Sequence, residues 1–178
     1  AISSATVLSQ IKTDSFVVNS QSLLDLFIGN KAGCIGETSI LLILISFIFL
    51  LVTKIIDWRA PIAMIFTVFI CTFIAGAISA SSLQVGFEKG LLSLLTGGVM
   101  FGATFMVTDY ATTPVTKPGR LIFGFGCGLI TFLIRQFGGY PEGVMFSILI
   151  MNSIAPFLNN LTVRMYGYGR KKWVQKKI

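Results

Sequence analysis

Long apolar stretches separated by short polar connections dominate the chain after residue 35. Five stretches suit a membrane span, which takes about 20 mostly apolar residues and fewer when the ends lie among the lipid headgroups. They run over residues 36–53, 60–80, 86–108, 120–137 and 143–161. The pattern therefore predicts an all-α integral membrane protein with about five transmembrane helices.

The third and fourth stretches differ from the others because they are rich in glycine and less uniformly apolar. Gly98 and Gly102 in the third, and Gly124 and Gly128 in the fourth, are four residues apart. This spacing is typical of closely packed membrane helices. Either stretch could instead be broken or partly re-entrant.

The flanking segments are polar or basic and give the chain three parts. Residues 1–35 are mostly polar, and the six apolar residues Leu23–Ile28 are too few to cross a bilayer, so we interpret them as an interfacial turn of helix. Residues 36–163 form the transmembrane domain, and residues 164–178 form a basic tail.

Composition supports lipid as the main environment. The chain is 54% hydrophobic and 12% charged, with a mean hydropathy of +0.83, whereas ordinary soluble domains carry roughly 25% charged residues. The net charge of +7 lies between and after the apolar stretches, which argues against nucleic acid as a partner.

The same basic residues predict an orientation, because positive residues concentrate on the cytoplasmic side. Five spans place ten of them on one side and four on the other: Lys54, Arg59, Lys117, Arg120, Arg164, Arg170, Lys171, Lys172, Lys176 and Lys177 against Lys12, Lys31, Lys89 and Arg135. The C-terminal tail is thus predicted to be cytoplasmic and the N-terminal segment extracytoplasmic.

Several kinds of chemistry are disfavoured. The chain has no histidine, and Cys34, Cys71 and Cys127 lack the CxxC spacing of metal sites, so no metal is expected. No acidic residue falls near the middle of a predicted span, where proton relays usually place one. An ion path in this chain would rely on hydroxyls, backbone carbonyls or partner subunits.

Three motifs could carry function. Ser3-Ser4-Ala5-Thr6 is either a turn-forming terminus or a site where a hydroxyl forms a phosphoester with a flavin phosphate. Asp109, with the threonines and proline that follow it, is either a local turn or the mouth of a pathway or cofactor clamp. Arg135 and Glu142 flank a Gly-Gly-Tyr-Pro turn and could pair, or Arg135 could contact an anionic group.

Four stretches together resemble the C-terminal part of the RnfD/NqrB family of ion-translocating electron-transfer complexes. They are residues 29–39, Thr96–Gly102, Met106–Pro114 and Arg135–Gly143, in the family's order. The run Arg-Gln-Phe-Gly-Gly-Tyr-Pro-Glu-Gly is closer to RnfD than to NqrB. The resemblance implies half of an inverted-repeat, urea-transporter-like fold.

The resemblance also implies a cofactor and partners. In this family a Ser-Gly-Ala-Thr motif carries FMN on its threonine, so Thr6 would be the covalent attachment point, beside Ser4 and Ala5, with Ser4 in place of the usual glycine. Arg135 is a further candidate cofactor contact, and a second, non-covalent flavin is left open. The implied setting is the bacterial inner membrane, with other membrane and peripheral subunits of an Rnf-type complex.

The leading hypothesis is therefore a flavin-carrying subunit of a redox-driven translocase of the ferredoxin:NAD oxidoreductase type, coupled to sodium or proton transport. No independent catalytic site is expected in this chain. The alternatives are a passive channel or solute transporter, favoured by the glycine-rich third and fourth stretches, and a structural scaffold without a cofactor.

Overall fold

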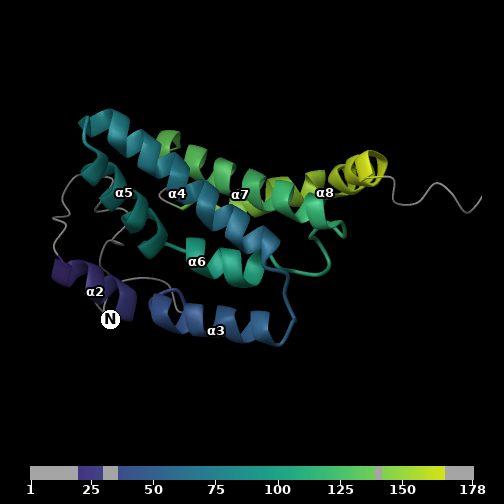
Figure 1. The fold of residues 1–178 in the computed structure, drawn as a ribbon, viewed down its shortest axis with the longest axis horizontal. Coiled ribbons are helices and arrows are strands. Elements are labelled where there is room, and N and C mark those ends of the chain that lie inside the picture. The colour runs from purple at the N-terminus through teal and green to yellow at the C-terminus, as the bar shows by residue number, and fades with distance from the viewer. Residues whose placement is uncertain (1–19, 30–35, 139–141, 167–178) are drawn as a thin grey trace, which may run out of the picture.

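The computed structural model describes residues 20–29, 36–138 and 142–166, and all regular elements in these ranges are helices (Figure 1). In chain order they are α2 (Ser20–Ile28), α3 (Ile40–Val52), α4 (Arg59–Ala80), α5 (Leu83–Leu95), α6 (Val99–Phe101), the π-helix η1 (Gly102–Met106), α7 (Lys117–Phe137) and α8 (Val144–Tyr166). The prediction of an all-helical fold is confirmed.

Three of the five predicted spans are continuous helices long and apolar enough to cross a membrane: Arg59–Ala80, Lys117–Phe137 and Val144–Thr162. A fourth is broken, because Leu83–Leu95 and Val99–Met106 meet at a bend of 64°. The first predicted span is the shorter helix α3, whose 13 residues cover about 20 Å at 1.5 Å per residue. The structure thus holds three or four full spans among its described residues.

Local signals set several helix ends. The side chain of Ser39 caps α3 by accepting a hydrogen bond of 3.4 Å from the N–H of Leu42. Thr116 caps α7 in the same way through the N–H of Gly119, and a proline occupies the first turn. Ser81 ends α4 in the left-handed conformation, with φ of 48°. The two side-chain caps satisfy N–H groups that a helix leaves without partners.

Helix α4 is the centre of the bundle and packs against both α5 and α7. A side chain at Gly124 would collide with the backbone of Ala60, and one at Gly128 would lie 2.8 Å from the carbonyl oxygen of Met64. The packing role predicted for these two glycines is confirmed. It also explains why α7 is continuous: the glycines of the fourth stretch serve close contact, not a break.

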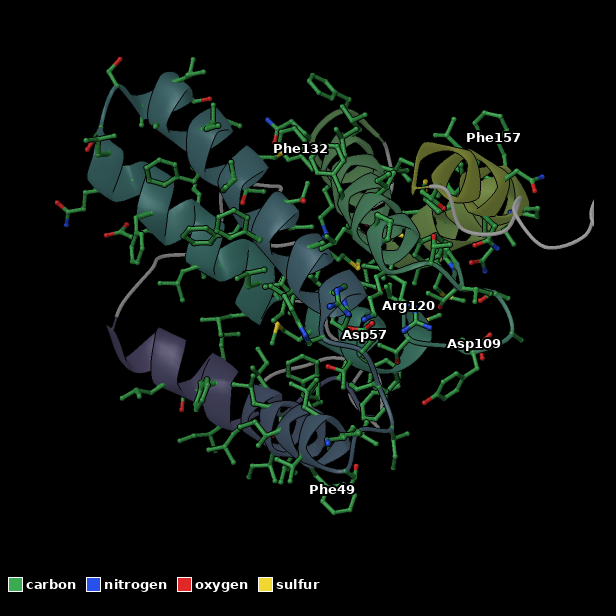
Figure 2. The ribbon with its side chains drawn as sticks, turned by 45° about the vertical axis from the view of Figure 1, so that its right-hand side comes forward. Phe49, Asp57, Asp109, Arg120, Phe132 and Phe157 are labelled. Atoms are coloured by element: carbon green, nitrogen blue, oxygen red, sulfur yellow. The ribbon has the colours of Figure 1, made fainter. Side chains whose placement is uncertain are left out.

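The outer faces of the helices remain apolar. Phe49 on α3 and Phe157 on α8 are 63% and 64% exposed, and both point outward from the bundle (Figure 2). The core itself is formed mainly by α4, α6, η1, α7 and α8, around the fully buried residues Met64, Val68 and Phe123. An apolar surface over an apolar core is the arrangement of a helical bundle in lipid.

Helix α2 contains the apolar patch predicted before the first span. Leu26 is buried, whereas Leu24 and Ile28 are exposed. Figure 1 shows α2 and α3 on one side of the bundle, beside the α5–α6 region. The interfacial location of this patch and the three-part division of the chain stay predictions.

Candidate functional site

The break between α5 and α6 is the first feature with unusual chemistry. Thr96 ends α5, with its N–H bonded to the carbonyl of Leu92 at 2.9 Å, and Gly97 then adopts φ of +67°. Such a φ favours glycine, because a side chain would clash with the backbone. The prediction that the third stretch could be broken is confirmed.

Arg135, near the end of α7, reaches into this break. Its Nη1 atom donates to the carbonyl oxygen of Ser93 at 2.7 Å and lies 3.2 Å from the Ser93 hydroxyl, and Nη2 donates to the carbonyl oxygen of Thr96 at 3.4 Å. The Nε atom is buried and has no hydrogen-bond partner. The guanidinium therefore binds the C-terminal carbonyls of α5, the end at which a helix carries partial negative charge.

Two carboxylates surround the same break. Glu37 lies against Gly98, where a side chain would come within 2.5 Å of its Oε1 atom, so a carboxylate adjoins the start of the second half-helix. Glu142 and Glu37 both interact electrostatically with Arg135. The pair predicted between Arg135 and Glu142 is thus an electrostatic interaction between opposite charges. Arg135 and Glu37 each lie at the helix end whose dipole attracts their charge.

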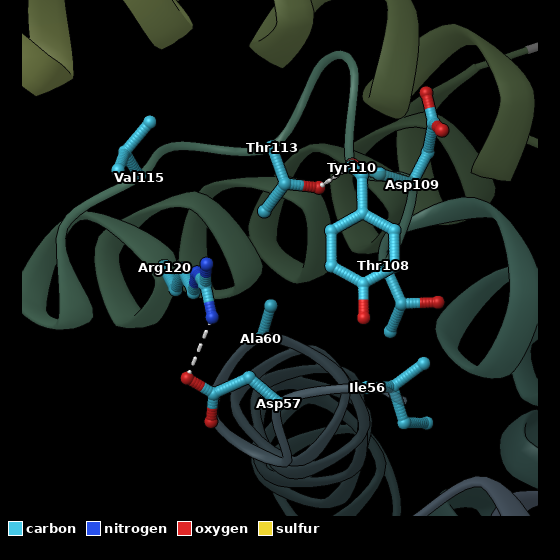
Figure 3. Close-up of a pocket in the computed structure, with 9 residues that line it drawn as sticks. All are labelled: Ile56, Asp57, Ala60, Thr108, Asp109, Tyr110, Thr113, Val115 and Arg120. Atoms are coloured by element: carbon cyan, nitrogen blue, oxygen red, sulfur yellow. Dashed lines mark hydrogen bonds and ion pairs between the residues drawn. The ribbon is translucent and has the colours of Figure 1, made fainter. Parts of the chain in front are cut away.

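A pocket of about 210 Å³ lies at the opposite end of α7 (Figure 3). Its lining comes from the α3–α4 connection, α4, the segment after η1, and α7: Ile56, Asp57, Ala60, Thr108, Asp109, Tyr110, Thr113, Val115 and Arg120. The Asp109 segment therefore borders a cavity, and its role as a pathway mouth or cofactor clamp stays a prediction.

Asp57 and Arg120 form the charged wall of this pocket. Arg120 donates from Nη1 to Asp57 at 2.8 Å and from Nε to the carbonyl of Pro114 at 3.0 Å, while Arg59 donates to the same carboxylate at 2.9 Å. Burial alone would raise the pKa of Asp57, but hydrogen bonds from the Arg59 backbone and from both guanidinium groups hold it below its ordinary value. The carboxylate is therefore firmly ionised.

Asp109 itself forms a local turn. Its carboxylate accepts hydrogen bonds from the N–H of Ala111 at 3.4 Å and from the Thr112 hydroxyl at 3.1 Å. The hydroxyl of Thr113 donates to the carbonyl of Val107 at 2.9 Å. In Figure 3 the Asp109 carboxylate points away from Asp57 and Arg120. The Asp109 carboxylate therefore serves a local turn, as one interpretation predicted. The segment around Asp109 lines the pocket.

The predicted cofactor site stays a prediction. Ser4, Ala5 and Thr6 lie outside the described residues. Arg135 is described, and its role as a cofactor contact stays a prediction. Sequence reasoning missed Glu37, Ser93 and Asp57 as members of charged clusters. The glycine-rich break at 96–98 was a usable signal for the first two, whereas nothing local marked Asp57 as the partner of a residue on α7.

These features define a class: a polytopic helical membrane protein with one broken span and with charged clusters near the two ends of α7. The chain belongs to the NQR2, RnfD, RnfE family, whose model matches residues 1–167. The predicted resemblance is confirmed.

Individual relatives agree with this assignment. The chain is 43% identical over 154 residues to the D subunit of the Na⁺-translocating ferredoxin:NAD⁺ oxidoreductase complex of Acetobacterium woodii, covering 85% of this chain and 45% of the relative. It is 38% identical over 180 residues to the D subunit of the ion-translocating oxidoreductase complex of Stutzerimonas stutzeri, and this match covers 95% of this chain and 49% of the relative. It is 41% identical over 139 residues to the D subunit of the proton-translocating ferredoxin:NAD⁺ oxidoreductase complex of Clostridium ljungdahlii, and this match covers 77% of this chain and 40% of the relative. The chain thus spans about half the length of these relatives or slightly less.

Proposed function

We propose that this chain is the C-terminal part of a flavin-carrying membrane subunit in a bacterial ion-translocating electron transport complex of the ferredoxin:NAD oxidoreductase type. The observation that carries the proposal is the 43% identity to the Acetobacterium woodii relative across 85% of the chain. The subunit relays electrons between other membrane and peripheral subunits, and their transfer is coupled to sodium or proton transport. The relatives named for sodium and for protons are similarly close, so the identity values favour neither ion.

Thr6 is the proposed attachment point, through a phosphoester between its hydroxyl and FMN, with Ser4 and Ala5 as small neighbours. A bound flavin supplies the electron-carrying chemistry, and the protein holds the group and tunes it electrostatically. Arg135 already uses both terminal nitrogens on carbonyls of α5. Its Nε atom has no hydrogen-bond partner, so Arg135 keeps a donor for an acceptor oxygen of a flavin.

The proposed location is the bacterial inner membrane, with the N-terminal segment extracytoplasmic and the basic tail cytoplasmic. The excess of basic residues on one side supports this orientation. A membrane-impermeant thiol reagent tests it on a Thr13→Cys variant in a cysteine-free background. Labelling of intact spheroplasts supports the proposal, and labelling only after lysis contradicts it.

Flavin attachment is tested on the full-length subunit purified from its native membrane. After denaturing electrophoresis, the subunit should fluoresce as a flavoprotein, and the Thr6→Val variant should not. Thr13→Val is the matched control, because it removes a nearby hydroxyl outside the motif. A wild-type band without fluorescence, or a fluorescent Thr6→Val band, overturns the assignment.

The broken span gives a passive channel or solute transporter as the second candidate, because transporters often bind substrate at broken helices. Flavin content and solute flux separate the two functions. A complex that carries no flavin but conducts a solute without an electron donor favours the channel.

A further inference from the structure

The carbonyl end of α5 is built like a cation ligand set. The last carbonyls of a helix lack donors within the helix and carry partial negative charge. Here the chain leaves the helix at Gly97 and Gly98, so Ser93 and Thr96 present their carbonyl oxygens to the break. In membrane proteins with broken helices, such carbonyls coordinate small cations.

A side chain already occupies this position. The two terminal nitrogens of Arg135 bind the carbonyls of Ser93 and Thr96, at 2.7 Å and 3.4 Å. We propose that Arg135 is a tethered cation that fills the carbonyl end of α5 and closes the broken span to free ions. The guanidinium does so permanently because it stays charged at any physiological pH.

The surrounding charges explain why the position needs a cation. Glu37 adjoins Gly98 on the far side of the break, and both Glu37 and Glu142 interact electrostatically with Arg135. One guanidinium thus binds two carbonyl oxygens and interacts electrostatically with two carboxylates. Removal of its charge would leave the carbonyl oxygens of Ser93 and Thr96 without the guanidinium, and such carbonyls attract a small cation from water.

The fork geometry distinguishes this role from simple charge balance. An arginine places two nitrogens in one rigid plane, whereas a lysine offers a single point charge. Arg135 uses that fork to bridge carbonyls three residues apart. Arg135→Lys would keep the charge but not the bridge, so it should close the break less completely than the wild type.

The inference depends on the membrane location of the chain and not on the flavin. Its test uses the complete complex with the full-length subunit, reconstituted in liposomes without an electron donor, with passive uptake of radioactive Na⁺ as the readout. Arg135→Ala should raise uptake several-fold, and Arg135→Lys should give an intermediate value. Added methylguanidinium should suppress the uptake of Arg135→Ala saturably and leave the wild type unchanged.

Lys89→Ala is the matched control, because it removes an exposed cation from α5 itself without touching the break. Its uptake should equal that of the wild type. If Arg135→Ala does not assemble, Arg135→Gln replaces it, since glutamine removes the charge and keeps hydrogen-bonding groups.

Unchanged Na⁺ uptake in an assembled charge-removing variant overturns the inference, as does an increase that methylguanidinium does not suppress. Flavin content is measured on the same preparations. A lack of flavin counts against the proposed function, whereas unchanged uptake counts against closure by Arg135, so the two failures are distinguishable.

Discussion

The guanidinium of Arg120 donates a hydrogen bond of 2.8 Å to the carboxylate of Asp57, 63 residues earlier in the chain. The contact joins the α3–α4 connection to the start of α7 (Figures 2 and 3). Because Arg59 shares the same carboxylate, one acidic side chain organises two cations at this end of the bundle.

Asp57→Asn should destabilise the bundle. The Asp57 side chain is only 17% exposed, and the substitution leaves two guanidinium groups without their charged acceptor. Hydrogen bonds to charged groups contribute about 1.5–3 kcal/mol, so we expect a loss of that order. Thermal unfolding of the detergent-purified protein measures it. Asp109→Asn is the control, since that carboxylate serves an exposed local turn, and an equal loss there would contradict the prediction.

Acid should weaken the same contact. The folded pKa of Asp57 lies below its ordinary value of 3.8, so its contribution is complete above that value and is lost as the pH falls through the folded pKa. The unfolding temperature of the wild type should therefore fall more steeply than that of Asp57→Asn between about pH 4 and pH 3. Parallel pH profiles would show that the ion pair does not contribute.

Two glycines on α7 should respond differently to alanine. At Gly124 the new methyl group would meet the rigid backbone of Ala60, whereas at Gly126 it would meet the flexible end of the Met151 side chain, 2.6 Å away. Overpacking costs about 1–3 kcal/mol, and we expect Gly124→Ala to show this loss in thermal unfolding. Gly126→Ala should be much milder. The reverse order would contradict the α4–α7 contact.

A buried hydroxyl pair should stabilise the contact between α7 and α8. The hydroxyl oxygens of Thr131 and Ser147 lie 2.8 Å apart, and both residues are buried. Hydrogen bonds between membrane helices average about 0.6 kcal/mol and reach about 1.7 kcal/mol, so Thr131→Val should cost an amount in that range. Thr72→Val is the control, because the Thr72 hydroxyl bonds only to carbonyls of its own helix. Equal losses in thermal unfolding would argue against the interhelical bond.

Apolar length predicted the existence of the membrane helices better than their continuity. Hydropathy located α4, α7 and α8 because each is one uninterrupted apolar run. It could not decide which glycine-rich stretch breaks, since Gly97 requires a positive φ whereas Gly124 and Gly128 make room for α4. The same residue type serves both purposes, and only the neighbouring helix separates them.

The candidate site shows a similar division. The sequence marked Arg135 because it flanks the Gly-Gly-Tyr-Pro turn and could contact an anionic group, but its acceptors are backbone carbonyls that no side-chain pattern reveals. Asp57 and Arg120 pair across 63 residues, and the sequence pattern marked neither as the partner of the other. Motif order identified the family, while tertiary packing determined these contacts.

The π-helix η1 sets the rotational position of the turn that directly follows it. Its Val107 N–H bonds to the carbonyl of Gly102, five residues back, so this turn holds one residue more than an α-helical turn with its bond four residues back. One residue corresponds to about 100° around a helix axis. Deletion of a single residue from Gly102–Met106 would restore α-helical winding and swing Thr108 and Tyr110 by that angle away from the wall of the Asp57 pocket. The extra residue in this π-helical turn thus sets the angle at which Thr108 and Tyr110 line the Asp57 pocket.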